Sequence, residues 1–280
     1  MGKRTEAWSP EQVVESGRAR VLILVAHPDD EWLGAGSLLP ILRDRWIVQV
    51  TDGAPRDLKD ARRLGFRARA EYARARRREA LAALRHAGIP RTRRIELGFA
   101  DQEVVLGLKD LVRQLQAILE RLRPDVVLTH SYEGGHPDHD AISFALAFVA
   151  RRIACEGGIA PERIEMAGYH SRADGGMEAG VFLHPNLAAR TRPEERVRLL
   201  TARERARKRN ALRQFASQRS MIDLFPLETE RFRQAPPYDF RRPPHPGSLL
   251  YERLALGPGG DRFRREVEKV LAIGPSWRAA

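Results

Sequence analysis

Cysteine is nearly absent from this chain, and long apolar runs are absent altogether. Cys155 is the only cysteine in 280 residues, so the chain can form no intramolecular disulfide and no zinc site built from several thiolates. Such usage is typical of a reducing compartment, and we expect a cytoplasmic protein. The longest apolar run near the start, Val21 to Ala26, is far shorter than the ~18 residues that a membrane span needs and too short for a signal-peptide core. We therefore expect no membrane span, and we interpret the N-terminal residues as a polar lead-in.

Acidic residues are fewer than basic residues. The chain has 49 Lys+Arg against 37 Asp+Glu, a formal net charge of +12, and twelve of its arginines lie between residues 62 and 94. Such an excess can mark nucleic-acid binding. No zinc finger, RNA-binding signature or repeated pairing of Arg with aromatic residues accompanies it. We interpret the basic stretches as solvated helix faces and expect no specific nucleic-acid partner.

A nucleotide-binding module is the alternative that the glycines raise. Gly34 and Gly36 begin a sequence like the dinucleotide fingerprint, but Leu39 stands where the third glycine is needed. The turn before them holds His27 and Asp29, and a carboxylate there would repel a pyrophosphate. A basic nucleotide- or nucleic-acid-binding module therefore remains the weaker alternative.

Short aliphatic runs alternate with longer amphipathic stretches between residues 20 and 170. The runs predict buried strands and the stretches predict helices, an alternation typical of βαβ units with right-handed crossovers. We predict an α/β fold: a Rossmann-like, mostly parallel sheet with helices on both faces and an active site at the carboxyl edge of its strands. The predicted strands are 20–26, 47–51, 95–97, 125–129 and 164–169, and the predicted helices are 33–43, an Arg-rich helix ending near 86, 104–122 and 141–152.

The pattern weakens after about residue 175, where prolines accumulate. Two basic helices are expected near 193–216 and 261–272, joined by irregular chain. We predict an α/β catalytic core over residues 1–175 and a Pro-rich C-terminal extension over 176–280 that wraps around the same domain. His245 lies in this extension between prolines. It could close over the active site, but a surface position in a loop is favoured.

Two segments contain the candidate catalytic and metal-binding residues, and their sequences resemble each other. His27-Pro28-Asp29-Asp30-Glu31 follows the first predicted strand, and His136-Pro137-Asp138-His139-Asp140 follows the fourth. These strands flank the switch point in the commonest strand orders of open α/β sheets, so their carboxyl ends can bring the segments together. A catalytic zinc takes three protein ligands and leaves one position for water. The candidate ligands are His27, one of Asp29 and Asp30, and one or both of His136 and His139.

The remaining polar groups have roles available in hydrolysis. A carboxylate beside a metal can take the proton of an attacking water, and a non-ligating imidazolium can stabilise an oxyanion or protonate the leaving amine. The two segments therefore predict metal-assisted hydrolysis. Two histidines and a carboxylate also bind Fe(II) in non-haem oxygenases, which is a second alternative. That chemistry usually resides on a barrel of many short strands, which the βαβ alternation disfavours.

The two motifs together resemble the PIG-L/LmbE-like zinc-dependent de-N-acetylases. The resemblance rests on Ala26-His27-Pro28-Asp29-Asp30-Glu31 with Gly34 and Gly36 behind it, and on Gly135-His136-Pro137-Asp138-His139 downstream; it covers about residues 20–150. It implies a hydrolase that removes an N-acetyl group from a small-molecule N-acetylglucosamine-type sugar or glycoconjugate. The implied cofactor is Zn²⁺, with Fe²⁺ as another possible divalent metal.

The resemblance also implies roles residue by residue. Each role belongs to the residue that matches the family motif at that position. The implied zinc ligands are His27, Asp30 and His139; the implied general base is Asp29; His136 polarises or protonates the tetrahedral intermediate, with Asp138 oriented towards it; and Arg76 and Asp101 contact substrate hydroxyls.

Arg76 has partial support from helical periodicity. It shares one helical face with Tyr72, Ala80, Ala83 and Ala87, which predicts that it points inward. An inward Arg needs a partner. Structural pairing with Glu79, one turn further on, and contact with substrate are both open interpretations.

One position departs from the family pattern. Gly134 stands where some members carry an aromatic residue. Whether Tyr132 or Glu133 takes over a substrate contact is left open by the sequence.

Overall fold

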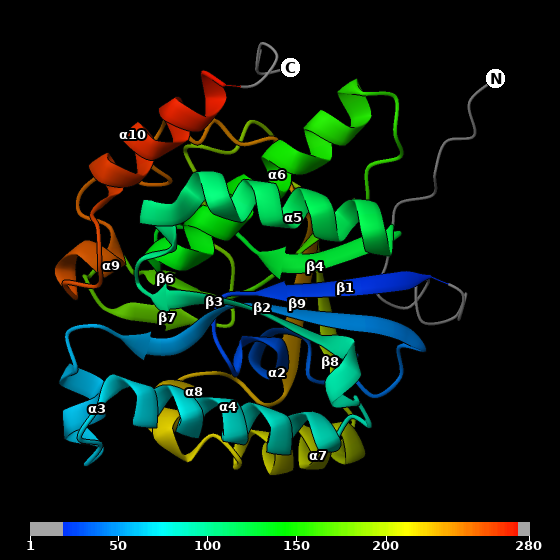
Figure 1. The fold of residues 1–280 in the computed structure, drawn as a ribbon, viewed down its shortest axis with the longest axis vertical. Helices are drawn as coiled ribbons and strands as arrows, with labels where there is room; N and C mark the ends of the chain where they lie inside the picture. The colour runs from blue at the N-terminus through cyan, green and yellow to red at the C-terminus, as the bar shows by residue number, and fades with distance from the viewer. Residues whose placement is uncertain (1–18, 274–280) are drawn as a thin grey trace.

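The fold is built on a seven-stranded sheet (Figure 1). The computed structural model describes residues 19–273. The strand order is β3-β2-β1-β4-β5-β9-β8; the first five strands in this order are parallel, and β9 runs antiparallel to both of its neighbours, β5 and β8. The strands are β1 (Arg20–Val25), β2 (Asp44–Pro55), β3 (Arg94–Asp101), β4 (Val126–His130), β5 (Glu162–Met166), β8 (Glu195–Leu199) and β9 (Thr229–Gln234).

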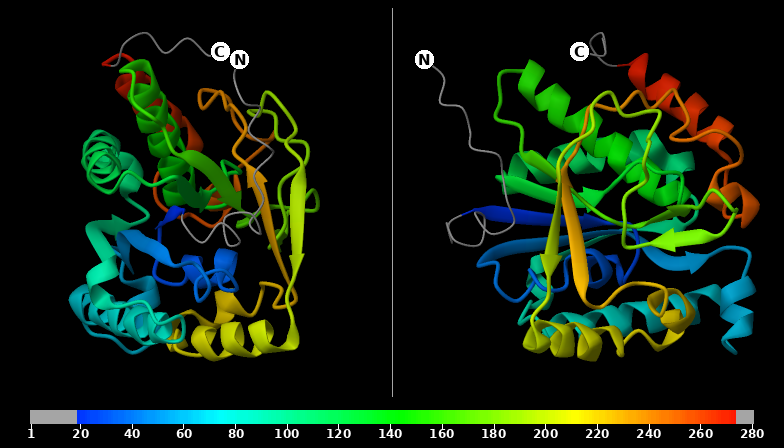
Figure 2. Two further views of the ribbon diagram at one scale, coloured as in Figure 1. Left: turned by 90° about the vertical axis from the view of Figure 1, so that its right-hand side faces the viewer. Right: turned by 180° about the vertical axis from the view of Figure 1, so that it is seen from behind.

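Helices cover both faces of this sheet, as Figures 1 and 2 show. Helices α5 (Leu108–Leu122), α6 (Pro137–Cys155) and α10 (Gly260–Leu271) lie on one face, and α2 (Asp30–Ala35), α4 (Arg69–Arg85) and α7 (Ala202–Leu212) lie on the other. The alternation of side chains along β1 explains the two cores: Val21, Ile23 and Val25 pack into one, and Leu22 and Leu24 into the other. The predicted α/β fold with helices on both faces is confirmed.

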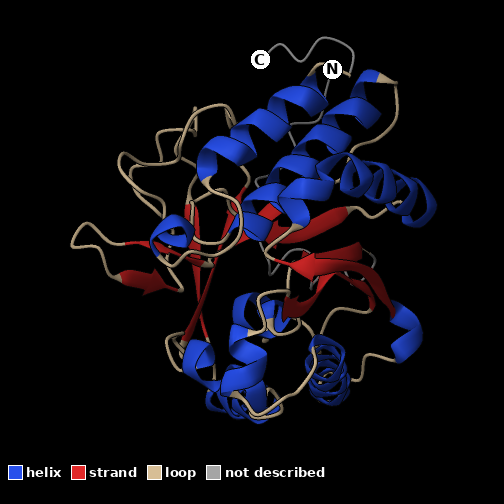
Figure 3. Ribbon diagram, turned by 60° about the vertical axis from the view of Figure 1, so that its left-hand side comes forward, coloured by secondary structure: helices blue, strands red, loops and turns tan. Residues whose placement is uncertain are grey.

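Some of the smaller elements lie near the carboxyl ends of the parallel strands (Figure 1). The hairpin of β6 (Tyr169–Ser171) and β7 (Met177–Ala179) projects there beside α9 (Leu250–Arg253), as Figure 3 shows. Helix α3 (Lys59–Arg63) follows β2, and α8 (Arg219–Ile222) follows α7. The 3₁₀ turns are η1 (Arg91–Arg93), η2 (Val104–Gly107) and η3 (Ala216–Gln218).

Most of the predicted elements have other bounds in the structure, and particular contacts explain three of these differences. The helix expected at 33–43 is α2, and it ends at Ala35 because the Ser37 backbone N–H donates to the Glu230 carboxylate at 3.0 Å instead of continuing the helical ladder. The second strand continues past residue 51 because β2 pairs with β3 through two register shifts. The helix expected at 193–216 shortens to α7: a capping box of Thr201 with Glu204 sets its start, and β8 precedes it.

The C-terminal region is part of the sheet and of both cores. Strands β8 and β9 extend the sheet beyond β5, and the buried Phe232 and Phe263 belong to the two cores on opposite faces. A fully buried ion pair of Lys208 with Glu230, 2.8 Å long, anchors α7 to β9. The C-terminal residues thus pack into the same sheet and the same cores as the residues before them. Within residues 19–273, no helix combines the length and apolarity that crossing a membrane requires.

Candidate metal centre and active site

The two motifs meet at the carboxyl ends of β1 and β4. These strands are direct neighbours in the sheet, and both motifs begin helices there: α2 starts at Asp30, and α6 starts at Pro137, which suits the first turn of a helix. The structure brings all of the predicted site residues into one buried cluster at this edge. Its members are His27, Asp29, Asp30, Arg76, Asp101, His136, Asp138 and His139.

Three donor atoms in the cluster form a nearly equilateral triangle. His27 Nδ1 lies 3.3 Å from Asp30 Oδ2, His139 Nε2 lies 3.4 Å from His27 Nδ1, and His139 Nε2 lies 3.6 Å from Asp30 Oδ2. Nitrogen and oxygen ligands at about 2.0–2.1 Å from a tetrahedral zinc are about 3.3 Å apart. The triangle therefore has the size that a small divalent cation requires.

The imidazole of His130 also lies beside this triangle. His130 was not among the site residues predicted from the sequence. It ends β4 and stacks on His139 with ring centroids 3.8 Å apart. Its Nε2 accepts the Ala26 backbone N–H at 2.9 Å, so that its lone pair is in use and is not available to a metal. Burial and the neighbouring His139 lower the pKa of His130 to about 4, so it is neutral. We assign His130 to positioning His139. The only signal in the sequence was its place at the end of a strand.

The other side of the His27 ring faces two carboxylates. Its Nε2 lies 3.1 Å from Asp101 Oδ1 and 3.3 Å from Asp138 Oδ2. A carboxylate that accepts the second ring N–H of a metal-binding histidine fixes its tautomer and its orientation. Asp138 is itself held by the backbone N–H groups of Gln102, at 2.7 Å, and Val104, at 3.0 Å. These bonds tie the second motif to the turn after β3.

This arrangement changes the expected role of Asp138. Its carboxylate lies 3.9 Å from His136 Nδ1, so it hydrogen-bonds to His27 and not to His136. His136 Nδ1 instead accepts the backbone N–H of residue 138 at 3.2 Å. The neutral ring then carries its proton on Nε2, which lies 3.7 Å from Asp101 Oδ1. Burial and the neighbouring His27 hold the pKa of His136 well below its usual value.

Asp29 occupies a strained position beside the triangle. Its φ of 136° is one that L-residues rarely adopt, and such strain persists only where the surrounding structure imposes it. Arg76 supplies part of that restraint: its Nη2 lies 3.2 Å from Asp29 Oδ2 and donates to the Pro28 carbonyl at 2.8 Å, while its Nη1 donates to the Gly53 carbonyl at 3.0 Å. Burial raises the pKa of Asp29 well above its ordinary value, although Arg76 opposes the shift.

The partner of Arg76 is therefore Asp29 and not Glu79. The Glu79 carboxylate instead accepts from the Ser217 hydroxyl at 2.5 Å and from its backbone N–H at 3.0 Å. Gly53 makes room for this guanidinium: a Cβ at this position would lie 2.9 Å from Arg76 Cζ, and its φ of +66° suits glycine. The inward face predicted for Arg76 is confirmed, since it is 3% exposed.

Tyr132 and Glu133 lie away from the triangle. Tyr132 is fully buried in the core below α10, and its hydroxyl donates to the Arg242 carbonyl at 3.0 Å. The Glu133 carboxylate accepts from the Leu183 backbone N–H and from Arg233, each at 2.9 Å. Both residues thus have structural partners within the protein.

Gly134 is covered by the C-terminal region. A Cβ here would lie 2.8 Å from Leu249 Cδ2, 3.2 Å from Pro244 Cγ and 3.4 Å from His245 Nε2. An aromatic side chain has no room at this position because the loop before α9 fills it. The expectation of a surface position for His245 is wrong: the side chain is buried at 9% exposure because this loop packs onto the second motif.

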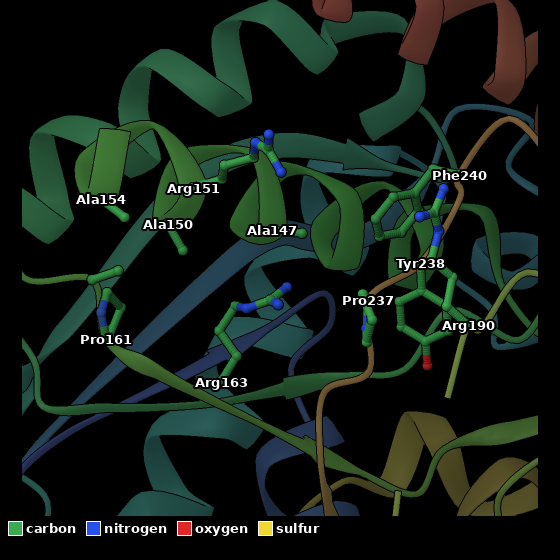
Figure 4. Close-up of a pocket in the computed structure, with 11 residues that line it drawn as sticks. Ala147, Ala150, Arg151, Ala154, Pro161, Arg163, Arg190, Pro237, Tyr238 and Phe240 are labelled. Carbon is green, nitrogen blue, oxygen red and sulfur yellow. The ribbon is translucent and has the colours of Figure 1, made fainter. Parts of the chain in front are cut away.

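A small cavity lies apart from the two motifs. It has a volume of about 280 Å³ and is lined by the C-terminal half of α6, by β5 and by the chain around residues 237–240. Figure 4 shows Arg163 and Tyr238 on its walls. His139, the residue of the metal-sized triangle that lies in α6, is at the opposite, N-terminal end of that helix, and none of the three triangle residues lines this cavity.

Comparison with known sequences agrees with these observations. Residues 22–150 match the PIG-L family, described as GlcNAc-PI de-N-acetylase. The probable N-acetyl-alpha-D-glucosaminyl L-malate deacetylase 2 of Bacillus cereus is 31% identical over 141 residues, which make up 49% of this chain. The match spans 63% of that relative's length. The predicted PIG-L/LmbE-like domain is confirmed.

Solved structures of low sequence identity share the fold. The A40926 pseudoaglycone deacetylase Dbv21 aligns with a TM-score of 0.57 at 20% identity, over 78% of this chain and 97% of that one. The N,N'-diacetylchitobiose deacetylase from Pyrococcus horikoshii aligns with a TM-score of 0.52 at 18% identity, over 82% of this chain and 88% of that one. At these identities the likeness establishes the architecture.

Proposed function

Because residues 22–150 form a PIG-L family domain, we propose that this protein is a metal-dependent deacetylase. The substrate is an N-acetylglucosamine-type sugar or glycoconjugate, which is the class named for the Bacillus cereus relative. The observation that carries the proposal is the triangle of His27, Asp30 and His139 donor atoms beside the strained Asp29. In the reaction the amide C–N bond breaks, water supplies the new oxygen of acetate, and the amine leaves with a proton.

His27, Asp30 and His139 are the residues that would hold the metal. Two imidazoles and one carboxylate leave a coordination position open, as in catalytic zinc sites. When bound, zinc lowers the pKa of a water ligand and polarises the amide carbonyl. Nitrogen and oxygen donors also accept Fe²⁺, so the donor set is compatible with either metal.

Asp29 is the general base in this proposal. Asp29 directly precedes Asp30 in the chain and its carboxyl group interacts electrostatically with Asp30 and His27, and a raised pKa brings it closer to the pH at which it must accept a proton from water. Arg76 restrains that carboxylate through the 3.2 Å contact and keeps it from rotating out of the site. Positioning of this kind contributes because a base must lie within hydrogen-bond reach of the proton it abstracts.

His136 and Asp101 complete the site on the substrate side. The His136 Nε2–H can donate a hydrogen bond to the oxygen that becomes negative during attack, and the proton that Asp29 takes from water is then available to the departing amine. Asp101 faces both His27 and His136 and offers a carboxylate oxygen to a sugar hydroxyl. Asp138 acts indirectly, by fixing the tautomer and the position of His27.

The proposal is tested by acetate release and metal content, measured on the same preparations. Purified protein should contain about one equivalent of metal, release acetate from N-acetylglucosamine or its conjugates, lose activity with a chelator and regain it with zinc. Asp29→Asn should keep the metal and lower kcat by a factor of about 10²–10⁴, the usual contribution of general-base catalysis. Asp57→Asn, at an exposed position of the loop after β2, is the matched control and should change neither quantity.

Two outcomes would overturn the proposal. Full activity of metal-free protein would show that the reaction does not need a metal. An Asp29→Asn variant with unchanged kcat would remove Asp29 from the role of base.

A further inference from the structure

The small cavity between the C-terminal half of α6 and the start of β5 has strongly basic walls. Its volume of about 280 Å³ is just below the ~300–1,000 Å³ that is usual for ligand pockets, so it has room for a small molecule. Among the described residues that line it, none is an aspartate or a glutamate, and three are arginines: Arg151, Arg163 and Arg190. The cavity therefore collects positive charge in a recess that no catalytic residue lines.

The three arginines come from segments that are distant in sequence. Arg151 lies on α6, Arg163 lies on β5, and Arg190 lies in the chain before β8. The Arg190 backbone N–H donates to the Pro237 carbonyl at 3.0 Å, which fixes that segment against the third wall of the cavity. Figure 4 shows the three side chains around the same space. Their convergence is thus a product of the tertiary structure and not of a local run of basic residues.

Arg163 has no partner for its charge in the part of the chain that the structure describes. Its side chain is partly buried, and its guanidinium makes no hydrogen bond and no ion pair with residues 19–273. None of its nitrogens is among the solvent-inaccessible polar atoms that lack a partner, so the guanidinium is accessible from the cavity that it lines. Figure 4 shows it extending from β5 towards α6. Burial lowers the pKa of Arg163, because the cation is less well solvated there than in water.

Acidic groups close to the cavity are engaged by other cations. Glu165 Oε2 accepts from Arg233 Nε at 2.7 Å. Asp239 pairs with Arg241 at 2.9 Å, although it also attracts Arg190. The C-terminal end of α6 contributes only about half of a negative charge, which is less than three guanidinium groups supply. The recess therefore keeps a net positive charge that an anion can neutralise.

The rest of the cavity wall is mostly apolar. Ala147 and Ala150 of α6 line one side, and Pro161, Pro237 and Phe240 line the others. A guanidinium binds the paired oxygens of a carboxylate or a phosphate through two parallel N–H groups. An inorganic anion would leave the alanine, proline and aromatic surfaces in contact with water, whereas an anion with an apolar body would cover them. The walls therefore favour an organic anion.

We propose that this cavity binds a small organic anion in which a carboxylate or phosphate group is joined to an apolar body. Arg163 donates hydrogen bonds to the anionic group, and Arg151 and Arg190 add to the positive potential that attracts it. The apolar body packs against the alanines of α6 and the Phe240 ring. The site is separate from the proposed deacetylase centre, and its test does not depend on that activity.

Calorimetry with four probes tests the inference: phenyl phosphate, benzoate, inorganic phosphate and phenol. At least one of the two organic anions should bind about ten-fold or more tightly than both phenol and inorganic phosphate, and the better of the two identifies the anionic group. Arg163→Met keeps the length of the side chain and removes its charge, so it should weaken that binding by about ten-fold or more. The binding should persist when a chelator is present, which excludes the candidate metal centre as its location.

Thermal unfolding without ligand separates a binding role of Arg163 from a structural one. Because its charge is uncompensated in the described chain, Arg163→Met should leave Tm unchanged or raise it, whereas loss of a structural arginine would lower Tm. Arg190→Met, at an exposed position, should also weaken anion binding without a change in β5.

Arg74→Met is the matched control, because Arg74 lies on the exposed side of α4, on the other face of the sheet, and it should change neither affinity nor Tm. Three results overturn the inference. They are no saturable binding of either organic anion, binding of phenol as tight as that of the anions, and anion affinity that Arg163→Met leaves within two-fold of the unsubstituted protein.

Discussion

The part of the chain before residue 150 and the part after it contribute different things to the same edge of the sheet. The first part supplies the metal-sized triangle, the strained Asp29 and the Arg76 that holds it. The second part supplies all the lining residues of a cavity of about 950 Å³, which lie between His170 and Arg253, together with the loop that covers Gly134. The PIG-L match ends at residue 150, so it covers the chemical groups and leaves out the cavity. The metal-sized triangle and the cavity are thus formed by different segments of this chain.

The two parts nevertheless contact each other through buried groups. Lys208 Nζ donates to Glu230 and to the Leu33 carbonyl in α2, both at 2.8 Å. The Glu230 carboxylate in turn accepts from the backbone N–H and hydroxyl of Ser37. The C-terminal region is therefore attached to the segment that follows the first motif. Three substitutions test how the two parts of the chain differ in their contributions.

The largest expected effect comes from breaking this attachment. Lys208→Ala leaves the Glu230 carboxylate as an uncompensated buried charge, and should lower the free energy of unfolding by about 3–5 kcal/mol, measured by urea denaturation. Lys109→Ala, on the exposed face of α5, is the control and should change stability by less than about 0.5 kcal/mol. A loss below about 1 kcal/mol for Lys208→Ala would show that the two parts are not coupled through this pair.

A smaller effect, on the catalytic rate and not on stability, is expected from a substitution in the part of the chain before residue 150. Arg76→Lys keeps the charge but cannot make the three contacts of a planar guanidinium, so kcat should fall by about 10–100-fold while metal content is unchanged. The neighbouring substitution Arg77→Lys, on the exposed face of α4, should leave kcat as it is. Equal kcat values for the two variants would mean that Arg76 does not position Asp29.

The smallest effect tests whether Tyr132 serves structure alone. Tyr132→Phe removes the hydrogen bond to the Arg242 carbonyl and should lower the free energy of unfolding by about 1 kcal/mol. Because the ring lies in the core, kcat/KM for an N-acetylated sugar should stay within about two-fold of the unsubstituted protein. A ten-fold fall in kcat/KM without a change in stability would show that Tyr132 takes part in substrate binding or catalysis.

The sequence by itself determined the α/β class and the place of the chemistry. Strand and helix periods are local signals, so the runs around residues 20–26 and 125–129 could be recognised as strands without any knowledge of their partners. The motifs follow those strands directly, and neighbouring parallel strands bring their carboxyl ends to one edge. Inward placement of Arg76 was likewise predictable, because helical periodicity assigns it to the buried face.

Only the tertiary structure decided which groups are partners. Arg76 and Asp29 are 47 residues apart in sequence, and no local pattern distinguishes that contact from the pairing with Glu79 one helical turn away. Contacts between residues distant in sequence also explain three other features. A backbone N–H uses the His130 lone pair, β8 forms a strand, and His245 is buried. Each depends on a neighbour distant in sequence, and packing against that neighbour outweighs local propensity.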